Sequence, residues 1–299
     1  MSVQERGGGA PANASGEWTV LALLRWTTDF FAKRGIDNAR LDAECLLAEA
    51  LACDRVTLYV DFEKPVTAVE RERFRELVRR RASERVPVSQ LLGRREFWSL
   101  DFAVTPDVLT PRPETEVLVA WAADRLAEAR PGARLLDLGT GSGCIALAVA
   151  SERPGIEVVA TDVSGAALAV ARRNAAALGL EERVELREGP FFEPVKGESF
   201  DCIVSNPPYI ARGDADGLPP ELGHEPEQAL FGGEDGLEVI RTLLAQAREH
   251  LVPGGRIGVE IDPRQEAAVC ELFEGSGLSN LQSLRDLSDR PRVVTGIRD

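Results

Sequence analysis

Arg-Leu-Leu-Asp-Leu-Gly-Thr-Gly-Ser-Gly-Cys-Ile-Ala-Leu-Ala runs from Arg134 to Ala148 and joins a short apolar run to a helical pattern through three alternating glycines. Gly139, Gly141 and Gly143 permit a tight turn and let the backbone approach a ligand where any Cβ would clash. A plain strand-to-helix turn is the alternative. The G-x-G-x-G spacing differs from the G-x-G-x-x-G of dinucleotide sites, so NAD fits poorly.

Apolar runs and helical patterns alternate from Pro111 onward, with helices predicted at Glu114–Ala127 and Ser164–Gly179 among others. This alternation predicts an α/β fold, a doubly wound and mainly parallel sheet with helices on both faces. In such a sheet a ligand binds past the carboxyl ends of the strands, where the strand order changes direction. Strands are predicted at Arg134–Leu138, Glu157–Thr161, Val184–Arg187, Phe200–Ser205, Arg256–Ile261 and Arg292–Ile297.

The chain before this region has a helical period from Trp18 to about Ser83. One helix is predicted to end at Gly35, a second covers Ala39–Cys53, and a third follows Thr67. We therefore predict a small, all-helical N-terminal domain over residues 17–90.

A period of two over Glu96–Pro106 predicts a strand, half of a β-hairpin within residues 91–110. This hairpin links the helical domain to the α/β domain, residues 111–299. Residues 1–16 contain Gly-Gly-Gly and no apolar segment, so they are predicted to be a flexible tail and not a signal peptide.

The composition is that of an ordinary globular protein, with 44% hydrophobic and 28% charged residues. No apolar run approaches the roughly 18–20 residues that span a bilayer, so no membrane association is predicted. The net charge of −14 counts against a nucleic-acid partner. The basic cluster Arg71–Arg85 is interleaved with glutamates and is interpreted as the solvated face of a helix, with a docking surface as the alternative.

The five cysteines are scattered and form no C-x-x-C pair, which is typical of reduced, mostly buried thiols in a cytoplasmic protein. They are Cys45, Cys53, Cys144, Cys202 and Cys270. The two histidines, His224 and His250, have no partner at metal-ligand spacing, so no metal site is predicted.

Asp162 directly follows the strand predicted at Glu157–Thr161, about twenty residues past the glycine turn. A carboxylate at this place accepts hydrogen bonds from both hydroxyls of a ribose. The alternative is that Asp162 caps the helix that begins near Ser164. The glycine turn and the acid together predict a ligand of the adenosine type.

Asn206-Pro207-Pro208-Tyr209 ends the strand predicted at Phe200–Ser205. Neither proline has an N–H to give to a β-ladder, which explains why pairing stops here. It does not explain the asparagine before the prolines or the tyrosine after them. A double-proline turn with a packed tyrosine is the structural alternative to a functional motif.

Asp-Leu-Gly-Thr-Gly-Ser-Gly, followed by an acid after the next strand, resembles the class I methyltransferases, which bind S-adenosylmethionine. Ser-Asn-Pro-Pro-Tyr resembles the enzymes among them that methylate planar nitrogens. With four further segments the chain resembles the peptide chain release factor glutamine methyltransferases, from about Trp18 to its end. These segments are Ala39–Glu44, Arg95–Leu100, Thr110–Glu116 (Thr-Pro-Arg-Pro-Glu-Thr-Glu) and His224–Leu237 (His-Glu-Pro-Glu-Gln-Ala-Leu-Phe-Gly-Gly-Glu-Asp-Gly-Leu).

The resemblance implies a Rossmann-like methyltransferase domain and a set of cofactor contacts. Asp162 would bind the ribose, and Asn206 would also lie by the cofactor. Pro190-Phe191 stands where the family has Asp-Trp beside the adenine, so Phe191 can stack on the base but position 190 offers no carboxylate. The methionine part would be held by Gly139, Thr140, Gly141, Ser142 and Gly143.

Three charged residues of the Pro-Arg-Pro segment, Arg112, Glu114 and Glu116, match the family. The sequence leaves open whether they form a wall of the active site or the start of a helix.

The tetrapeptide suits methylation of a carboxamide, whose nitrogen lone pair is delocalised and must be freed by holding both N–H groups. Asn206 Oδ1 and the Pro207 carbonyl are the two acceptors predicted, and the paired prolines fix both in extended backbone. Tyr209 is predicted to form an aromatic wall against the amide, and no general base is required. The predicted catalytic and substrate-binding residues are Asn206, Pro207, Pro208 and Tyr209.

By resemblance, the substrate is the glutamine of the Gly-Gly-Gln segment in class-1 release factors, docked by the helical domain of a monomeric enzyme. Three alternatives remain open. They are glutamine methylation on a ribosomal protein, amino-methylation of a nucleic acid, and a binding module that holds the cofactor without chemistry.

Overall fold

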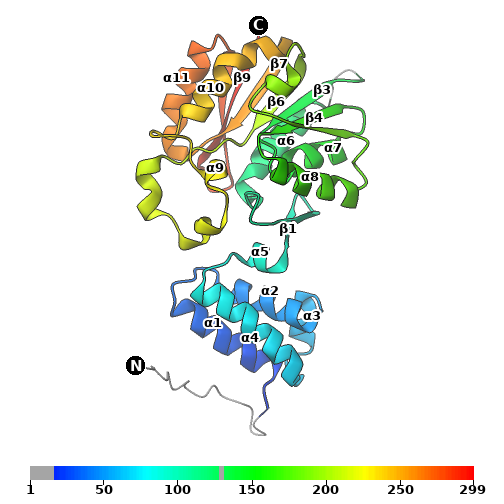
Figure 1. Ribbon diagram of the computed structural model, residues 1–299, viewed down its shortest axis with the longest axis vertical. Coiled ribbons are helices and arrows are strands. Elements are labelled where there is room, and N and C mark those ends of the chain that lie inside the picture. Colours follow the sequence, from blue (N-terminus) through cyan, green and yellow to red (C-terminus); the bar gives the residue numbers. More distant parts are fainter. Residues whose placement is uncertain (1–16, 128–130) are drawn as a thin grey trace. The chain divides into compact units, whose positions relative to one another are not determined.

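A computed structural model of the chain describes residues 17–127 and 131–299. The chain divides into two units, Met1–Leu92 and Gly93–Asp299, drawn in Figure 1. The tail predicted over residues 1–16 lies outside the described residues. Over the described ranges, every helix is too short or too polar to cross a lipid bilayer.

The first unit is all-helical, as the sequence predicts, and its helices enclose one apolar core that includes Phe31, Leu46 and Leu47. Thr67 forms a capping box with Glu70, which explains why the third long helix begins there. The two short helices were not predicted, because one or two turns carry too little periodicity. The elements are α1 (Val20–Ala32), α2 (Ala39–Leu51), α3 (Arg55–Val60), α4 (Ala68–Ser83) and α5 (Val88–Leu92).

A buried ion pair joins α2 to α4 inside this unit. Arg81 Nε donates to Asp42 Oδ2 at 2.7 Å, and the two side chains are only 9% and 12% exposed. The arginine-rich helix therefore turns one of its charges inward, while Arg79 pairs with Glu76 at the exposed surface.

The second unit begins with a two-stranded antiparallel hairpin, β1 (Arg94–Phe97) and β2 (Leu100–Ala103). A hairpin was predicted, but the continuous strand over Glu96–Pro106 is wrong, because the chain reverses at Trp98 and Ser99. Both residues have positive φ, 54° and 56°, as a tight hairpin turn requires. Neither is glycine or asparagine, so the sequence carried no turn signal.

The main sheet has seven strands in the order β5-β4-β3-β6-β7-β9-β8. All neighbouring strands from β5 to β7 are parallel, while β9 is antiparallel to both β7 and β8. The doubly wound, mainly parallel fold is thus confirmed. The strands are β3 (Arg134–Leu138), β4 (Glu157–Asp162), β5 (Val184–Glu188), β6 (Phe200–Ser205), β7 (Leu251–Glu260), β8 (Ser279–Arg285) and β9 (Pro291–Ile297).

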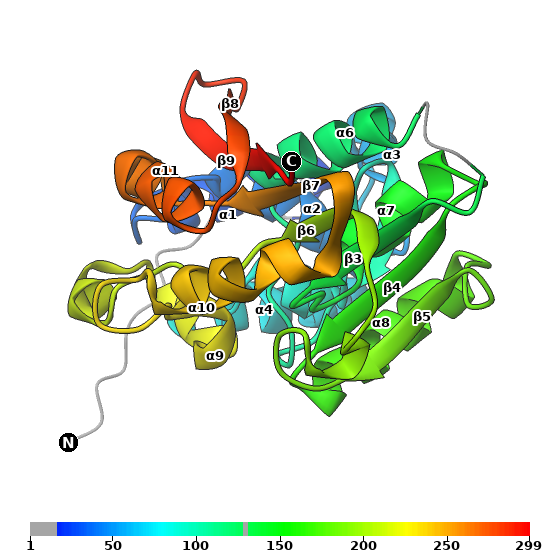
Figure 2. The same cartoon turned by 90° about the horizontal axis from the view of Figure 1, so that it is seen from above.

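Helices cover both faces of this sheet, each over its own apolar cluster. The cluster with Leu118, Ile145 and Ala175 packs under α6, α7 and α8, and the one with Leu243 and Phe273 packs under α10 and α11. Figure 2 shows α7 and α8 beside β4 and β5, and α10 and α11 beside β7 and β9. These helices are α6 (Glu116–Arg125), α7 (Cys144–Glu152), α8 (Gly165–Ala177), α9 (Glu227–Leu230), α10 (Glu238–Ala247) and α11 (Glu266–Gly275). Short 3-10 turns complete the unit: η1 (Pro113–Thr115), η2 (Glu193–Val195), η3 (Arg212–Gly217), η4 (Pro220–His224), η5 (Arg248–His250) and η6 (Pro263–Gln265).

The strand order reverses between β3 and β6. The chain winds outward through β4 and β5 and then returns to the other side of β3, where Leu138 pairs with Ser205. The loops after these two strands, the glycine turn and the Asn-Pro-Pro-Tyr segment, therefore leave the sheet side by side. This is the position at which parallel sheets bind ligands.

We expect Arg81→Met to lower the free energy of unfolding by about 3–5 kcal/mol, because it removes one partner of a buried ion pair. Amide hydrogen exchange of α2 and α4 in the full chain measures this loss locally. The double variant Asp42→Leu/Arg81→Met should recover most of it. Arg79→Met, at an exposed pair, should leave the exchange of these helices unchanged, and equal effects of the two arginines would contradict the prediction.

Candidate active site

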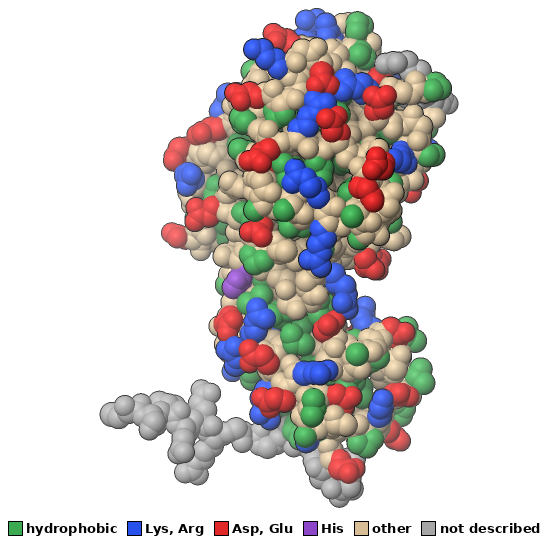
Figure 3. Space-filling view, turned by 45° about the vertical axis from the view of Figure 1, so that its right-hand side comes forward, with side chains coloured by type: hydrophobic (Ala, Val, Ile, Leu, Met, Phe, Trp, Pro, Cys, Tyr) green, Lys and Arg blue, Asp and Glu red, His purple; other side chains and the backbone are tan. Residues whose placement is uncertain are grey.

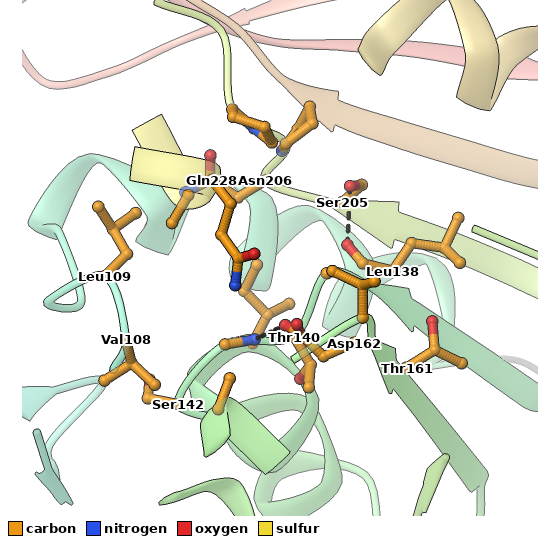
Figure 4. Close-up of a pocket in the computed structure, with 18 of the residues that line it drawn as sticks. Val108, Leu109, Leu138, Thr140, Ser142, Thr161, Asp162, Ser205, Asn206 and Gln228 are labelled. Carbon is orange, nitrogen blue, oxygen red and sulfur yellow. Dashed lines mark hydrogen bonds between the residues drawn. The ribbon is translucent and has the colours of Figure 1, made fainter. Parts of the chain in front are cut away.

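A cavity of about 270 Å³ opens at the carboxyl ends of β3, β4 and β6. Figure 4 shows its wall, with Val108 and Leu109 on one side and Leu138, Thr161 and Asp162 on the other. The cavity brings together most of the predicted site residues. The predicted residues that line it are Gly139, Thr140, Gly141, Ser142, Asp162, Phe191, Asn206, Pro207 and Pro208.

The glycine turn is held at the edge of the sheet by its own backbone. The N–H groups of Gly139 and Thr140 both donate to the Thr161 carbonyl at 2.9 Å. A Cβ on Gly141 would meet no atom within 4 Å, so its φ of +55° and the approach of a ligand are what favour glycine there. Gly143 does not line the cavity; a Cβ there would come within 3.0 Å of Leu147. The absence of a side chain at Gly143 thus leaves room for Leu147 of α7 and Ala171 of α8.

Asp162 ends β4 and accepts two backbone hydrogen bonds. Gly141 N–H donates to Oδ2 at 2.8 Å and Ser164 N–H to Oδ1 at 2.9 Å. The N-cap of α8 is Ser164 itself, so the capping alternative for Asp162 is wrong. Burial raises the pKa of Asp162, and these backbone donors oppose that rise. Each carboxylate oxygen keeps a second lone pair for a ligand hydroxyl.

Asp137, inside β3, is a polar residue of the turn that the sequence did not single out. It is fully buried, accepts from Thr140 Oγ1 at 2.6 Å and from Ala146 N at 3.2 Å, and so ties the turn to the start of α7. Its Oδ1 has no partner among the described residues. Burial raises the pKa of Asp137 to about 7. In the sequence, its position in the segment Leu-Asp-Leu-Gly was the only sign that Asp137 could support the turn.

Phe191 lines the cavity beside Pro190 with a φ of +47°, an uncommon conformation for a residue with a side chain. The preceding Gly189 is required by packing, because a Cβ there would lie 2.6 Å from Pro194 Cγ. The loop after β5 therefore places Phe191 at the same cavity as the glycine turn, and its stacking on an adenine stays a prediction.

Asn206 follows the last residue of β6, Ser205, whose hydroxyl donates to the Leu138 carbonyl at 2.8 Å (Figure 4). The Asn206 Nδ2 group donates to Thr115 Oγ1 at 3.2 Å. In the part of the chain that the structure describes, no protein donor reaches Asn206 Oδ1 or the Pro207 carbonyl. Both predicted acceptors thus remain available at the cavity.

The far side of the tetrapeptide rests on Phe231–Gly236, a segment that carried no assigned role. A Cβ on Gly232 would lie 2.4 Å from the Pro208 carbonyl oxygen, and one on Gly236 would lie 2.3 Å from that of Tyr209. Gln265 Nε2 also donates to the Tyr209 carbonyl at 3.0 Å. Glycines here let two backbones touch, which fixes the tetrapeptide from behind.

Tyr209 itself does not line the cavity. Its ring packs against the apolar cluster under α10 and α11, and burial, reinforced by the nearby Glu260 carboxylate, raises the pKa of its phenol. The structure therefore places Tyr209 behind the prolines, which matches the packed tyrosine of the structural alternative.

The Pro-Arg-Pro segment divides between both of its proposed roles. Arg112 lines the cavity and pairs with the buried Glu225 at 2.6 Å, and Glu225 also accepts from Thr110 N. Glu114 lies in η1, and Glu116 opens α6 and accepts from Trp98 N at 3.0 Å. Arg112 is thus part of the wall, and the two glutamates belong to the helix start.

The histidines and cysteines lie apart from the cavity, except that Cys144 reaches its wall. His250 stacks on Phe192 with ring centroids 4.4 Å apart. All five cysteines are free; Cys202 is buried and the other four are partly buried. Across the described ranges, no three His, Cys, Asp or Glu side chains gather as metal ligands.

Comparison with known proteins gives two family matches. Residues 22–93 match the PrmC N-terminal domain, and residues 115–221 match the methyltransferase small domain. The chain is 45% identical over 280 residues to the release factor glutamine methyltransferase of Geobacter sulfurreducens, across 93% of this chain and 96% of that protein. It is 49% identical to that of Xylella fastidiosa, across 86% and 92%.

A solved methyltransferase structure from Pyrococcus furiosus is also similar, with a TM-score of 0.51 and 22% identity. The match covers 67% of this chain and 89% of that one. At this identity the likeness concerns the fold alone.

Asp137 predicts a dependence of stability on pH. Because its pKa is about 7 when folded and about 3.9 when unfolded, its contribution is complete below pH 4 and is lost as the pH rises through 7. We expect the free energy of unfolding to fall less between pH 5 and 8 in Asp137→Asn than in the wild type, by on the order of 1–4 kcal/mol. Urea titrations at both pH values measure the free energy of unfolding. An equal fall between pH 5 and 8 in the two proteins would refute the prediction.

Proposed function

The chain belongs to the release factor glutamine methyltransferase family, and we propose that it methylates the side-chain amide nitrogen of the glutamine in the Gly-Gly-Gln segment of class-1 peptide chain release factors. The observation that carries this proposal is the pair of unused acceptors, Asn206 Oδ1 and the Pro207 carbonyl, at a cavity that the glycine turn also lines. A carboxamide NH₂ needs two acceptors of this kind.

S-adenosylmethionine is the methyl donor that the family implies, and the residues of the cavity fit it. Gly141 offers an approach with no Cβ, and Asp162 keeps two lone pairs for the ribose hydroxyls. Phe191 offers a face for the adenine. When bound, S-adenosylmethionine supplies a methyl group on a positively charged sulfur as the electrophile.

The protein's part in the reaction is to orient the substrate nitrogen. One N–H would donate to Asn206 Oδ1 and the other to the Pro207 carbonyl, which directs the nitrogen lone pair into the cavity. Neither proline has an N–H that would compete with the substrate, and their fixed backbone sets both acceptors before the substrate arrives. Positioning of this kind is worth up to roughly 7–11 kcal/mol.

No general base is assigned, because the nitrogen becomes strongly acidic only after it has received the methyl group. Its proton then leaves to solvent, so no deprotonation has to precede the methyl transfer. Tyr209 is assigned no contact with the substrate amide, because its side chain packs against the apolar core and does not line the cavity.

The remaining expectations go with this proposal. The helical unit would help to dock the release factor, and the enzyme would act as a monomer in the cytoplasm. On the face of the α/β unit in Figure 3, basic and acidic side chains are interspersed.

The proposal is tested with purified protein and S-adenosylmethionine labelled in its methyl group. The substrates are a release factor, its Gln→Ala variant at Gly-Gly-Gln, ribosomal proteins and duplex DNA. We expect label on the unaltered release factor alone. Label on a ribosomal protein or on DNA, with none on the release factor, would establish one of the alternatives instead.

Asn206→Ala should keep the fold and lower kcat by on the order of 10²–10³, since it removes one preorganised partner of the substrate NH₂. Single-turnover methylation of the release factor measures this rate, and calorimetry of cofactor binding reports whether the site is intact. A variant that methylates at the wild-type rate would mean that Asn206 does not hold the substrate.

Asp162→Ala should weaken S-adenosylmethionine binding by roughly 10–100-fold, because it removes both ribose acceptors and the Gly141 hydrogen bond. Isothermal titration calorimetry gives the dissociation constant. Glu188→Ala is the matched control, since Glu188 pairs with Asp162 in the sheet register but does not line the cavity. Equal losses of cofactor affinity in the two variants would show that Asp162 does not bind the cofactor.

A further inference from the structure

Glu260 is a buried carboxyl group that the proposed reaction does not use. It is the last residue of β7, the residue is 1% exposed, and its Oε2 has no hydrogen-bond partner among the described residues. Burying a carboxylate without a cation is costly, so an apolar residue would be more favourable for folding alone.

The cations nearest to Glu260 are engaged elsewhere. Arg292 on β9 pairs with Asp286 at 2.8 Å, and Arg112 pairs with Glu225 at 2.6 Å. Both act on Glu260 only through space, and the Glu114 carboxylate opposes them. The direct partner of Glu260 is the hydroxyl of Thr115, which is itself buried.

Thr115 connects Glu260 to Asn206, because the same hydroxyl oxygen accepts the Asn206 Nδ2–H bond at 3.2 Å. A hydroxyl has one proton to donate and lone pairs to accept with. If Thr115 gives its proton to Glu260, its oxygen faces Asn206 as an acceptor only. The Asn206 amide must then turn its NH₂ toward Thr115, which leaves Oδ1 for the cavity.

The opposite arrangement would disable the site. If the Thr115 proton pointed at Asn206, the amide would present its oxygen to Thr115 and its NH₂ to the cavity. Two NH₂ groups, one from Asn206 and one from the substrate, would then face each other without an acceptor. The direction of one hydroxyl proton thus decides whether Asn206 can receive the substrate.

We propose that Glu260 is a positioning residue: as a carboxylate it accepts the Thr115 hydroxyl proton and so holds the Asn206 amide with its oxygen toward the substrate. The inference rests on the proposed function, in which Asn206 Oδ1 accepts a glutamine N–H. It adds a polar chain, Glu260–Thr115–Asn206, that reaches from the sheet into the cavity.

This role makes kcat depend on the ionisation of Glu260. When Glu260 is protonated it can donate to Thr115, and the Thr115 proton is free to turn toward Asn206. Burial raises the pKa of Glu260 to about 7, so kcat should rise with pH through the neutral range. The charged groups that face Glu260 are Arg292, Arg112 and Glu114, and the phenol of Tyr209 lies nearby.

The test measures kcat for release factor methylation from pH 5.5 to 9 at saturating cofactor, in the wild type, Glu260→Gln, Thr115→Val and Thr115→Ser. We expect Glu260→Gln to lose about 10–100-fold in kcat at pH 8, with cofactor affinity unchanged and the rise through neutral pH removed. Thr115→Ser keeps the hydroxyl and should keep the rise, whereas Thr115→Val should abolish it.

If Glu260 acts through Thr115, the double variant Glu260→Gln/Thr115→Val should be no slower than Thr115→Val alone. The proposal would be overturned if the kcat losses of the two single variants multiplied in the double variant. A wild-type pH profile in Glu260→Gln would also overturn it. Glu114→Gln is a further test, because the Glu114 carboxylate raises the pKa of Glu260 and lies outside the cavity wall. Its loss should move the rise of kcat to lower pH without abolishing it.

A second measurement needs no substrate. In ¹⁵N spectra of the wild type, the side-chain NH₂ signals of Asn206 should shift with an apparent pKa near that of Glu260, and this titration should vanish in Glu260→Gln. If it persists, the inference fails even though the enzyme methylates release factors. If the wild type shows the titration but no methylation of a release factor, the proposed function fails and the hydrogen-bonded chain stands.

Discussion

Parallel pairing of β3 with β6 is the constraint on which the site depends. The chain completes β4 and β5 on one side of β3 before it returns on the other, and Leu138 then lies opposite Ser205. The glycine turn and the Asn-Pro-Pro-Tyr segment start from these two adjacent strand ends. The sheet thus brings the predicted cofactor loop and the predicted substrate loop to one cavity.

The loops at this edge are fixed by polar contacts that reach across the chain. Arg112 pairs with Glu225, Asn206 bonds Thr115, and Gln265 bonds the Tyr209 carbonyl. Polar groups buried at the ends of strands need partners, and here the partners come from other loops of the same site. The family's sequence segments around Arg112, Glu225 and Gly232 are therefore one supporting structure for the tetrapeptide.

Such support suits a reaction that relies on orientation. An amide nitrogen has little nucleophilicity to enhance by a base, so the protein gains most by fixing two acceptors in advance. The backbone of two prolines fixes one acceptor permanently. The other, Asn206 Oδ1, belongs to a side chain that can turn over, and for this reason its orientation needs a partner such as Thr115.

The amino-acid sequence by itself determined the α/β class, the helical first unit, six of the sheet's strands and the loop residues Gly139, Asp162 and Asn206, because each depends on local periodicity or on short motifs. Positive φ at Trp98 and Ser99, which makes a hairpin from a predicted strand, had no glycine to mark it. Only the tertiary structure decided that Tyr209 faces the core, that Gly143 serves helix packing and that Thr115 meets Asn206 across 91 positions of sequence. Contacts of this kind follow from strand order and packing, which no local pattern encodes.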